Sequence, residues 1–399
     1  MTDQTPFRRT EENNQPLINA LKDFSTFKEL RASEIYQRHQ SKLAELFNTP
    51  RIYRAEATKP RLQSFLRVAV WNIERGRELD GIIDVLNHHP VLQYADLLLL
   101  NELDDGMARS NNINVARELG RAISAHAIYG VEYLEFTKGT GKELHLADDN
   151  TAALHGNAIL TRYDFANPQI ARLSRCENNF ESAEKRLGGR LCILTDIAIG
   201  SANFLASTAH LDVVNTPRCR ARQLQSAIAA IEARRQSGAN PIAKIILGGD
   251  FNTHTFARGG KLRALKNTAR ILGTSPAWLR RSLMKKEPAI LELGHRGFAV
   301  DQFNDHEPTS YSIVSSLDDK SSLPAPVRWW AMRRIGHAGL KLDLRLDWLA
   351  ARGFRALQDG EIIDAATGVQ SICPQTIKNL SYEGRALADH DPIVADMLW

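Results

Sequence analysis

Residues 244–254 read Lys-Ile-Ile-Leu-Gly-Gly-Asp-Phe-Asn-Thr-His and place a short apolar run in front of two glycines, Asp250 and Asn252. An apolar run of this length is too short for most helices and is typical of a buried strand, in which alternate residues face the same side. We therefore expect this strand to deliver a carboxylate and an amide, on one side, to the mouth of a sheet.

The same arrangement, an apolar stretch joined to Asn, Glu, His or Asp, recurs along the chain. The other junctions are Val-Ala-Val-Trp-Asn at 68–72, Asp-Leu-Leu-Leu-Leu-Asn-Glu at 96–102, Phe-Leu-Ala-Ser-Thr-Ala-His at 204–210, Leu-Arg-Leu-Asp-Trp-Leu at 344–349 and Ala-Asp-His-Asp-Pro-Ile-Val at 388–394. Together with the first, they could converge on one site.

The composition is that of a soluble globular protein. Of 399 residues, 43% are hydrophobic and 24% are charged, which is enough to bury one large core or two ordinary ones. The first residues lack the apolar core of a signal peptide, and no later stretch approaches the roughly 18 apolar residues of a membrane span. We therefore expect a cytoplasmic protein without an integral membrane segment.

The cysteines and the net charge are less specific. Cys176, Cys192, Cys219 and Cys373 are scattered and show no C-x-x-C spacing, so we expect buried free thiols and neither a disulfide framework nor a thiolate zinc site. The net charge of +5 comes from 51 basic and 46 acidic residues. Such an excess helps an anionic substrate only where it is clustered.

The chain divides into an amino-terminal segment and a larger domain. Residues 17–48 carry apolar residues at helical spacing and predict two helices before Pro50, with a linker to about residue 64. We interpret 1–64 as an accessory segment and 65–399 as the catalytic domain. Apolar runs predict strands near 66–72, 96–101, 157–161, 191–199, 203–209, 243–249, 344–349 and 393–398. Helical patterns lie at 79–88, 112–125 and 217–236, so sheet-rich layers with outer helices follow.

Glu102 is the first candidate for metal binding. It follows four leucines and Asn101, and a carboxylate at the end of a buried strand needs a cation or an arginine to offset its desolvation. Magnesium prefers oxygen ligands, keeps several waters and takes one or two carboxylates, so Glu102 with Asn72 nearby is a sufficient anchor. The alternative is that Glu102 pairs with an arginine and Asn72 caps a turn.

Two histidines and their neighbours are candidates for proton chemistry. Asp347 lies within an apolar run, from which its carboxylate could orient and stabilise an imidazolium. Asp389 and His390 add a carboxylate and an imidazole before the final strand. His210 ends another strand, where a hydrogen-bonded structural histidine is the alternative to a catalyst.

Taken in chain order, these motifs resemble the endonuclease/exonuclease/phosphatase superfamily, which includes DNase I-like nucleases, apurinic endonucleases, neutral sphingomyelinases and inositol polyphosphate phosphatases. The motifs are Trp-Asn-Ile, Asn-Glu, Gly-Asn-Ala-Ile-Leu-Thr-Arg at 156–162, Ala-His-Leu, Gly-Asp-Phe-Asn, Leu-Asp-Trp and Ala-Asp-His-Asp-Pro-Ile. The resemblance spans about residue 66 to the carboxyl terminus. It implies a four-layered α/β sandwich, with two central, mostly antiparallel β-sheets flanked by helices, and divalent-metal-dependent hydrolysis of a phosphoester.

Carried over residue by residue, the resemblance implies specific metal-binding and phosphate-positioning groups. Asn72 and Glu102 would hold Mg²⁺ or Mn²⁺, and Asp389 resembles the acidic residue that contacts metal or phosphate. Asp250 and Asn252 would position the water and the phosphate.

The histidines also have counterparts in the family. His390 resembles the catalytic histidine and Asp347 the carboxylate paired with it, while His210 matches a second histidine that apurinic endonucleases generally lack. A metal and two imidazolium donors would stabilise the charge that phosphoryl transfer concentrates on oxygen. Asn157 matches a family strand near the site, where a structural role and a phosphate contact both stay open.

Two basic clusters bear on the substrate. From Thr253 to Lys286 there are nine basic residues and no Asp or Glu, with apolar residues interleaved, so we expect a basic helical insertion near 253–290. Arg328, Trp329 and Trp330, followed by Arg333 and Arg334, would suit stacked bases and phosphates or an anionic membrane surface. The alternative is that the tryptophans cover a core edge and the arginines form a solvated face.

The sequence therefore predicts a metal-dependent phosphoesterase, and in particular a phosphodiesterase (nuclease) that hydrolyses nucleic acid by attack of water on phosphorus. The alternative within enzymes is a sphingomyelinase-like phospholipid phosphodiesterase. A second alternative is a non-catalytic module that binds nucleic acid or a protein. The intact set of candidate site residues argues against that module, because a pure binder has no need to keep every group.

Overall fold

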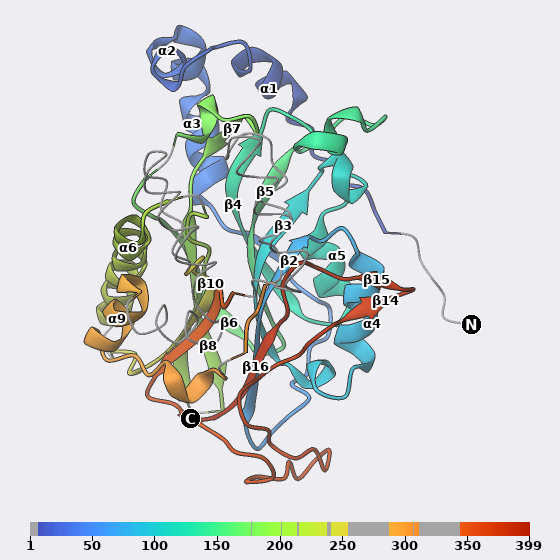
Figure 1. Ribbon diagram of the computed structural model, residues 1–399, viewed down its shortest axis with the longest axis vertical. Coiled ribbons are helices and arrows are strands. Elements are labelled where there is room, and N and C mark those ends of the chain that lie inside the picture. The colour runs from blue at the N-terminus through green and yellow to red at the C-terminus, as the bar shows by residue number, and fades with distance from the viewer. Residues whose placement is uncertain are drawn as a thin grey trace, which may run out of the picture.

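The computed structural model describes residues 7–176, 178–200, 202–213, 215–237, 241–253, 287–305, 307–310 and 344–399 (Figure 1). Most of the predicted basic insertion, residues 254–286, lies outside these ranges. The predicted substrate-binding residues Arg328, Trp329 and Trp330 also lie outside the described residues.

Two mixed β-sheets form the centre of the fold. The larger has the strand order β1 (Arg51–Tyr53), β4 (His126–Glu135), β5 (Leu154–Thr161), β3 (Leu97–Asp105), β2 (Leu66–Arg75), β16 (Ile393–Leu398) and β12 (Arg355–Ala356), with β7 (Arg186–Gly188) on β4 and β13 (Gln375–Thr376) on β16. The smaller has the order β11 (Asp347–Arg352), β10 (Lys244–Asp250), β9 (Ala202–Ala209), β8 (Leu191–Ile199) and β6 (Phe165–Arg172). Only the β2–β3 and β9–β10 pairs are parallel among the described strands, so both sheets are mostly antiparallel, as predicted. A separate hairpin pairs β14 (Ser381–Tyr382) with β15 (Arg385–Ala386).

Helices cover the outer face of each sheet. On one side lie α4 (Leu79–His88) and α5 (Val115–Ala122), and on the other α6 (Pro217–Gln236) and α9 (Pro288–His295) (Figure 1). The amino-terminal segment forms α1 (Gln15–Leu21), α2 (Phe27–Ala32) and α3 (Glu34–Asn48). Single-turn 3-10 helices lie at Leu92–Tyr94, Ala108–Ser110, Gly141–His145, Asn179–Glu181 and Asp301–Phe303. The result is the predicted mixed α/β fold with two main sheets flanked by helices.

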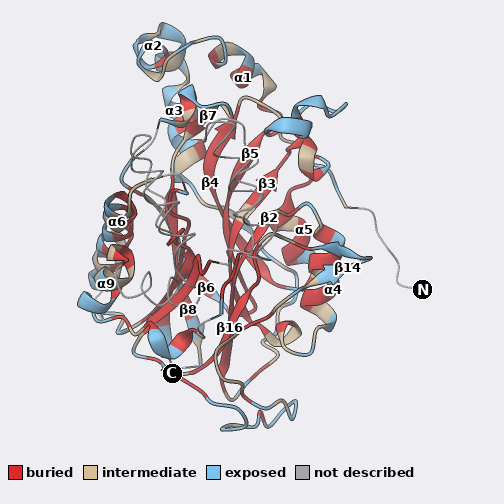
Figure 2. Ribbon diagram, viewed as in Figure 1, coloured by how far each residue is buried: buried red, intermediate tan, exposed pale blue. Residues whose placement is uncertain are grey.

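The central strands are buried on both faces, and this explains their continuous apolar runs. In β2, Val68 and Val70 pack between the sheets, whereas Ala69 and Trp71 pack toward the outer helices. In β10, Ile246 faces the other sheet and its neighbours Ile245 and Leu247 face α6 and α9. Figure 2 shows the resulting pattern of buried sheets and helices with exposed outer faces. Such strands show no alternation of apolar and polar residues because neither face meets water.

The two glycines before Asp250 lie within β10 and allow it to pass close to its neighbours. A Cβ on Gly248 would lie 2.7 Å from Val70 Cγ2 and 2.8 Å from Leu99 Cδ1, both in the other sheet. A Cβ on Gly249, whose φ is +144°, would lie 2.0 Å from the carbonyl oxygen of Ala209. Gly248 therefore permits the two sheets to approach each other, and Gly249 permits β10 to lie close to β9, where Asp250 is presented.

Most predicted elements are present, but the amino-terminal helices and several strands differ from the prediction. The amino-terminal segment has three helices where two were expected, because Ser33 ends α2 and caps α3. Strands β4 and β6 were not predicted. The division of the chain at residue 64 stays a prediction, although β1, which precedes it, pairs with β4 in the larger sheet.

The prediction of free thiols is wrong for two of the four cysteines. Cys176 and Cys219 form a disulfide, with their Cα atoms 6.2 Å apart. The pairing joins the loop after β6 to the first turn of α6, across a separation of 43 residues that gives no local spacing signal. Cys192 is a buried free thiol, as expected, and Cys373 is free and half-buried.

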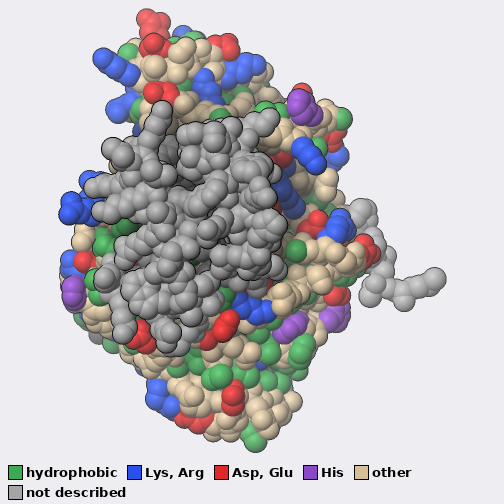
Figure 3. All heavy atoms as spheres, in the orientation of Figure 1, with side chains coloured by type: hydrophobic (Ala, Val, Ile, Leu, Met, Phe, Trp, Pro, Cys, Tyr) green, Lys and Arg blue, Asp and Glu red, His purple; other side chains and the backbone are tan. Residues whose placement is uncertain are grey.

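The described part of one face of the molecule carries mixed charge. Figure 3 shows Lys and Arg side chains interspersed with Asp and Glu over the described part of one face. No helix within the described ranges has both the length and the apolar character that crossing a membrane requires.

Candidate active site

Five polar side chains predicted from strand ends do come together. Asn72 of β2 donates from Nδ2 to Glu102 Oε1 of β3 and to Asp250 Oδ2 of β10, both at 3.1 Å. Asp347 is the direct cross-strand partner of Asp250. His390, just before β16, is hydrogen-bonded to Asp347. Because β2 and β3 are in the larger sheet and β10 and β11 in the smaller, the site is assembled from both sheets.

The backbone near the site is irregular in ways that aim these side chains. The pairing of β2 with β3 shifts register after Asn72, and the pairing of β3 with β5 shifts between Leu100 and Leu103, which frames Glu102. Glu102 and Asn252 have φ values of 57° and 49°. Positive φ is uncommon for residues other than glycine, and such strain gathers at functional sites.

Asp347 and His390 form a buried dyad. His390 Nδ1 lies 2.7 Å from Asp347 Oδ2, and Trp71 Nε1 donates to the His390 carbonyl oxygen at 2.9 Å. Burial alone would lower the pKa of His390, but the charges of Asp347 and Asp389 outweigh it and raise that pKa well above its usual value. The dyad therefore holds an imidazolium with its Nε2–H facing Asp250, 3.9 Å from Oδ2.

Asp250 is buried and held by three separate groups. Asn252 N donates to Oδ1 at 2.9 Å, Asn72 Nδ2 donates to Oδ2, and the Asp250 N–H donates to Asn101 Oδ1 at 2.7 Å. Burial and then the charge of Asp347 raise the pKa of Asp250 to about 7, against the opposing charge of His390. A carboxyl group with this pKa can exchange protons at neutral pH.

His210 is fixed as a neutral imidazole, which corrects the expectation of two imidazolium donors. Arg190 Nη1 lies 2.8 Å from His210 Nδ1, and because a guanidinium can only donate, Nδ1 must accept and the ring proton is on Nε2. Burial and then the charge of Arg190 lower the pKa of His210 well below its usual value. Its Nε2–H, 3.5 Å from Asp250 Oδ2, has no hydrogen-bond partner among the described residues.

Arg190 itself is anchored by two carboxylates that the sequence did not single out. Its Nη1 donates to Glu132 Oε2 at 2.7 Å and its Nε donates to Asp212 Oδ1 at 3.3 Å. Asn157 joins this network because its Nδ2 donates to Glu132 Oε1 at 3.0 Å. The available sequence signal for Arg190 was its place just before the apolar run 191–199.

An acidic group surrounds Glu102. Burial and the charge of Asp389, with a smaller contribution from Glu102, raise the pKa of Glu74 against the lowering effect of Arg77, and burial raises the pKa of Asp389. Burial would also raise the pKa of Glu102, but the charges of His155 and Arg75 outweigh it and lower that pKa. Carboxylates that repel one another in this way would be stabilised by a divalent cation.

The amide of Asn72 is oriented differently from what a metal ligand requires. Its Oδ1 accepts from the Glu74 N–H at 3.1 Å, so the amide presents its N–H₂ group to Glu102 and Asp250. One potential ligand atom from each of Asp250, Asp347 and His390 lies within 4.8 Å of the other two, and because the hydrogen bond to Asp347 occupies His390 Nδ1, the ring nitrogen left for a ligand role is Nε2. Glu102, whose charge acts on both Asp389 and Glu74, is a second position at which a cation would be stabilised.

The site lies between two packed sheets and has the groups of a hydrolytic enzyme. They are the charged Asp347–His390 pair, the Asp250 carboxyl with its pKa of about 7, and the carboxylates around Glu102 that a cation would stabilise. The chain belongs to the Endonuclease/Exonuclease/phosphatase family, whose family model matches residues 69–352. It is therefore a phosphoric ester hydrolase of a family whose enzymes generally depend on a divalent metal. Comparison with curated proteins gives no match.

Solved structures with low sequence identity are similar over most of the chain. The mannosyl-6-phosphatase Bt3783 of Bacteroides thetaiotaomicron is 14% identical, with a TM-score of 0.44 over 84% of this chain and 100% of that chain. The human Nocturnin catalytic domain is 14% identical, with a TM-score of 0.44 over 88% and 97%. TDP2 of D. rerio, complexed with single strand DNA product, is 15% identical, with a TM-score of 0.43 over 84% and 100%. These similarities do not define the substrate of this chain.

Proposed function

We propose that the protein is a divalent-metal-dependent phosphodiesterase that hydrolyses nucleic acid. The observation that carries the proposal is the placement of the Asp250 carboxylate 3.5 Å from the neutral ring of His210 and 3.9 Å from the charged ring of His390. A proton acceptor and two N–H donors thus converge on one position. This is the set of groups that attack of water on a phosphoester requires.

Each of these groups has a distinct role in the proposed reaction. Asp250 takes the proton from the attacking water, because its pKa of about 7 suits transfer at neutral pH. The Nε2–H groups of His390 and His210 donate to the phosphate oxygens, on which negative charge develops. Asp347 keeps His390 protonated and oriented, and the Asn252 amide, held by the Leu211 carbonyl at 2.9 Å, borders the same space.

The cation would be held by Glu102 and Asp389, with Glu74 as a further carboxylate. When bound, Mg²⁺ or Mn²⁺ supplies positive charge that neutralises the phosphate and the departing oxygen. Asn72 positions the two carboxylates Glu102 and Asp250 through its amide N–H₂ group, in place of the metal-ligand role that the sequence suggested.

The choice of nucleic acid rests on the sequence. The nine basic residues between 253 and 286 and the Arg328–Trp330 cluster are the charge and stacking groups that nucleic acid recognition uses. The described surface in Figure 3 carries mixed charge. A basic surface for the polymer would therefore have to come from those two segments.

Hydrolysis of a substrate panel tests the proposal. Single- and double-stranded DNA, RNA, sphingomyelin, bis-p-nitrophenyl phosphate and the corresponding monoester are incubated with Mg²⁺ or Mn²⁺, and with chelator as the control. Cleavage of a nucleic acid that chelator and Asp250→Asn both abolish supports the proposal. Cleavage of sphingomyelin alone would replace it with the phospholipid alternative, and binding of nucleic acid without any hydrolysis would overturn the enzymatic mechanism.

A further inference from the structure

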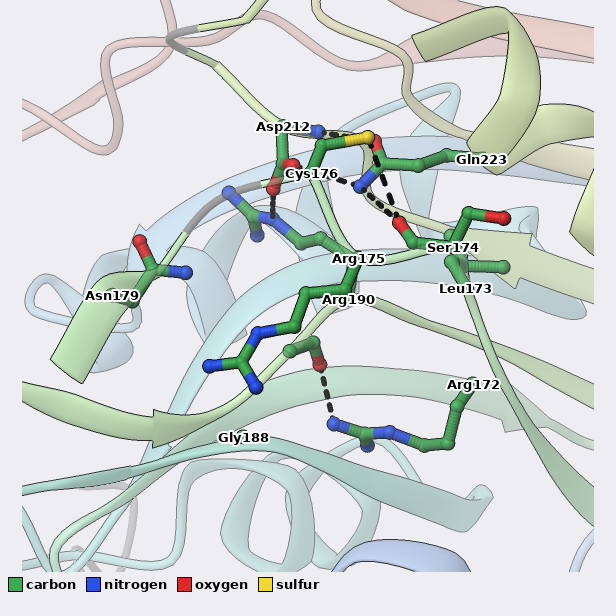
Figure 4. A pocket seen from close by; sticks show the side chains of 11 residues that line it. Arg172, Leu173, Ser174, Arg175, Cys176, Asn179, Gly188, Arg190, Asp212 and Gln223 are labelled. Atoms are coloured by element: carbon green, nitrogen blue, oxygen red, sulfur yellow. Dashed lines mark hydrogen bonds and ion pairs between the residues drawn. The ribbon is translucent and has the colours of Figure 1, made fainter. Parts of the chain in front are cut away.

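A pocket of about 170 Å³ opens beside the candidate active site. Its lining includes Arg172, Arg175, Arg190, Asn179, Asp212 and Gln223. Figure 4 shows Cys176, Asp212 and Gln223 gathered at one end of the pocket and Arg172 at the opposite end. A volume of 170 Å³ corresponds to roughly five or six water molecules in the liquid, which is enough for a phosphate group.

Arg190 connects this pocket to the site. The same guanidinium lines the pocket and lies 2.8 Å from His210 Nδ1, while the opposite nitrogen of that ring faces Asp250. One hydrogen bond, one imidazole ring and a gap of 3.5 Å therefore separate the pocket wall from Asp250. A substrate group in the pocket would be adjacent to, and distinct from, a phosphate at Asp250.

Among the residues that the structure describes, the charged groups that line the pocket are three guanidinium groups and one carboxylate. Arg172 is held rigidly, since its guanidinium donates to the carbonyl oxygens of Phe47, Val131, Glu132 and Gly189. The carboxylate of Asp212 already accepts from Arg190 Nε and from Gln223 Nε2, at 3.3 and 2.8 Å. The negative charge of Asp212 is therefore compensated. Arg190 also pairs with Glu132, which is not among the residues that line the pocket.

Arg175 completes the wall from an exposed loop. It follows β6 and its guanidinium stacks over the ring of Phe27 in α2, 4.1 Å from the ring centroid. The amino-terminal helices thus help to place a positive charge at the pocket. Arg31 stacks over the same ring at 5.8 Å but does not line the pocket.

We propose that this pocket is a second anion subsite, which binds the phosphate one nucleotide away from the phosphate that is cleaved. The inference rests on the proposed function and deepens it, because it predicts that a nucleotide substrate with two phosphates is hydrolysed more efficiently than a nucleotide substrate with one. Arg172 and Arg190 already use most of their N–H groups and would contribute mainly positive charge, whereas Arg175 would contribute the charge-assisted hydrogen bond to phosphate.

A pair of chromogenic substrates tests the subsite. The p-nitrophenyl ester of thymidine 5′-phosphate is compared with the same compound carrying a 3′-phosphate, so that the scissile bond is identical. We expect kcat/KM to be about tenfold higher for the substrate with two phosphates, as one added charge-assisted hydrogen bond would give. Arg175→Gln should remove this preference, Arg175→Lys should retain part of it, and the matched control Arg31→Gln should leave it unchanged.

The outcomes separate the subsite from the proposed function. Hydrolysis of both substrates at equal rates would overturn the subsite alone, as would a preference that survives in Arg175→Gln. Failure to hydrolyse either substrate would overturn the proposed function and the subsite with it. Should Arg175→Gln unfold, Asn179→Asp, which adds a negative charge to the same wall, is expected to lower the preference as well, and an unchanged preference would overturn the proposal.

Discussion

Asp250 and Asp347 are direct cross-strand partners in β10 and β11, so two buried carboxylates stand side by side. Like charges in this position repel each other unless a cation lies between them. The imidazolium of His390 fills that role, with Nδ1 2.7 Å from Asp347 and Nε2 3.9 Å from Asp250. One ring thus couples the orienting carboxylate to the reactive one.

The first prediction concerns this dyad. Asp347→Asn should lower kcat by about 10²- to 10⁴-fold and change KM little, because the amide cannot keep His390 protonated. His390→Gln should cause a similar loss. Steady-state kinetics of the double variant checks the coupling: a loss no larger than either single loss is expected, and additive losses would show that the two residues act separately.

The second prediction concerns the two histidines. His210 should stay neutral, with its proton on Nε2, from pH 5 to pH 8, because burial and the charge of Arg190 hold its pKa well below the usual range. His390 should stay protonated over the same interval, because Asp347 and Asp389 raise its pKa. Imidazole ¹⁵N NMR spectra of the protein, with His210→Gln and His390→Gln for assignment, test both. Titration of either ring near pH 6.5 would contradict the prediction.

The third prediction concerns Gly249. Gly249→Ala should lower the free energy of unfolding by about 3 kcal/mol or more, because its Cβ would meet the Ala209 carbonyl oxygen at 2.0 Å and the φ of +144° disfavours a side chain. Gly294→Ala is the control, since a Cβ there meets nothing within 4 Å. Urea denaturation measures both. Equal stabilities of the two variants would show that β9 and β10 can move apart at Gly249 at little cost.

The fourth prediction concerns Glu135, a fully buried carboxyl in β4. Neither of its oxygens has a hydrogen-bond partner among the described residues, and burial, reinforced by Glu184, raises its pKa to about 7. The folded protein therefore holds this proton while the unfolded chain releases it, so stability falls as the pH rises from about 4.5 to 7. Glu135→Gln should remove this loss and be more stable by up to about 3 kcal/mol above pH 7, with no gain near pH 4.5. Urea denaturation of both proteins at several pH values measures the difference in the free energy of unfolding. A stability gain that does not depend on pH would contradict the prediction.

The sequence allowed most strands to be predicted because the central ones are buried on both faces and appear as unbroken apolar runs. Strand β4 was not predicted because it contains Glu132 and Glu135, and charged residues of this kind are usually expected at the surface. Their burial depends on Arg190 and Arg186, more than fifty residues further along the chain. In β6, Asn167 and Pro168 interrupt the run, and the pairing with β8 shifts register there.

The candidate site was predictable to the extent that its groups follow strands. Asn72, Glu102, His210 and Asp250 each follow an apolar stretch and His390 precedes one, and the structure brings them together. Arg190, Glu132 and Asn101 were missed because their role arises only when β3, β4, β8 and β10 are assembled. The charge state of His210 follows from such an assembly contact and has no counterpart in the sequence.

Strand β16 lies between β2 and β12, although nearly the whole described chain separates it from β2. During translation, one edge of β2 therefore stays unpaired until β16 and the neighbouring His390 leave the ribosome. Such an edge is a target for pairing with other chains, so folding of this protein is vulnerable late and needs prompt closure of the sheet. The same order means that, if His390 acts as proposed, partly synthesised chains are inactive and hydrolysis begins only when the larger sheet is complete.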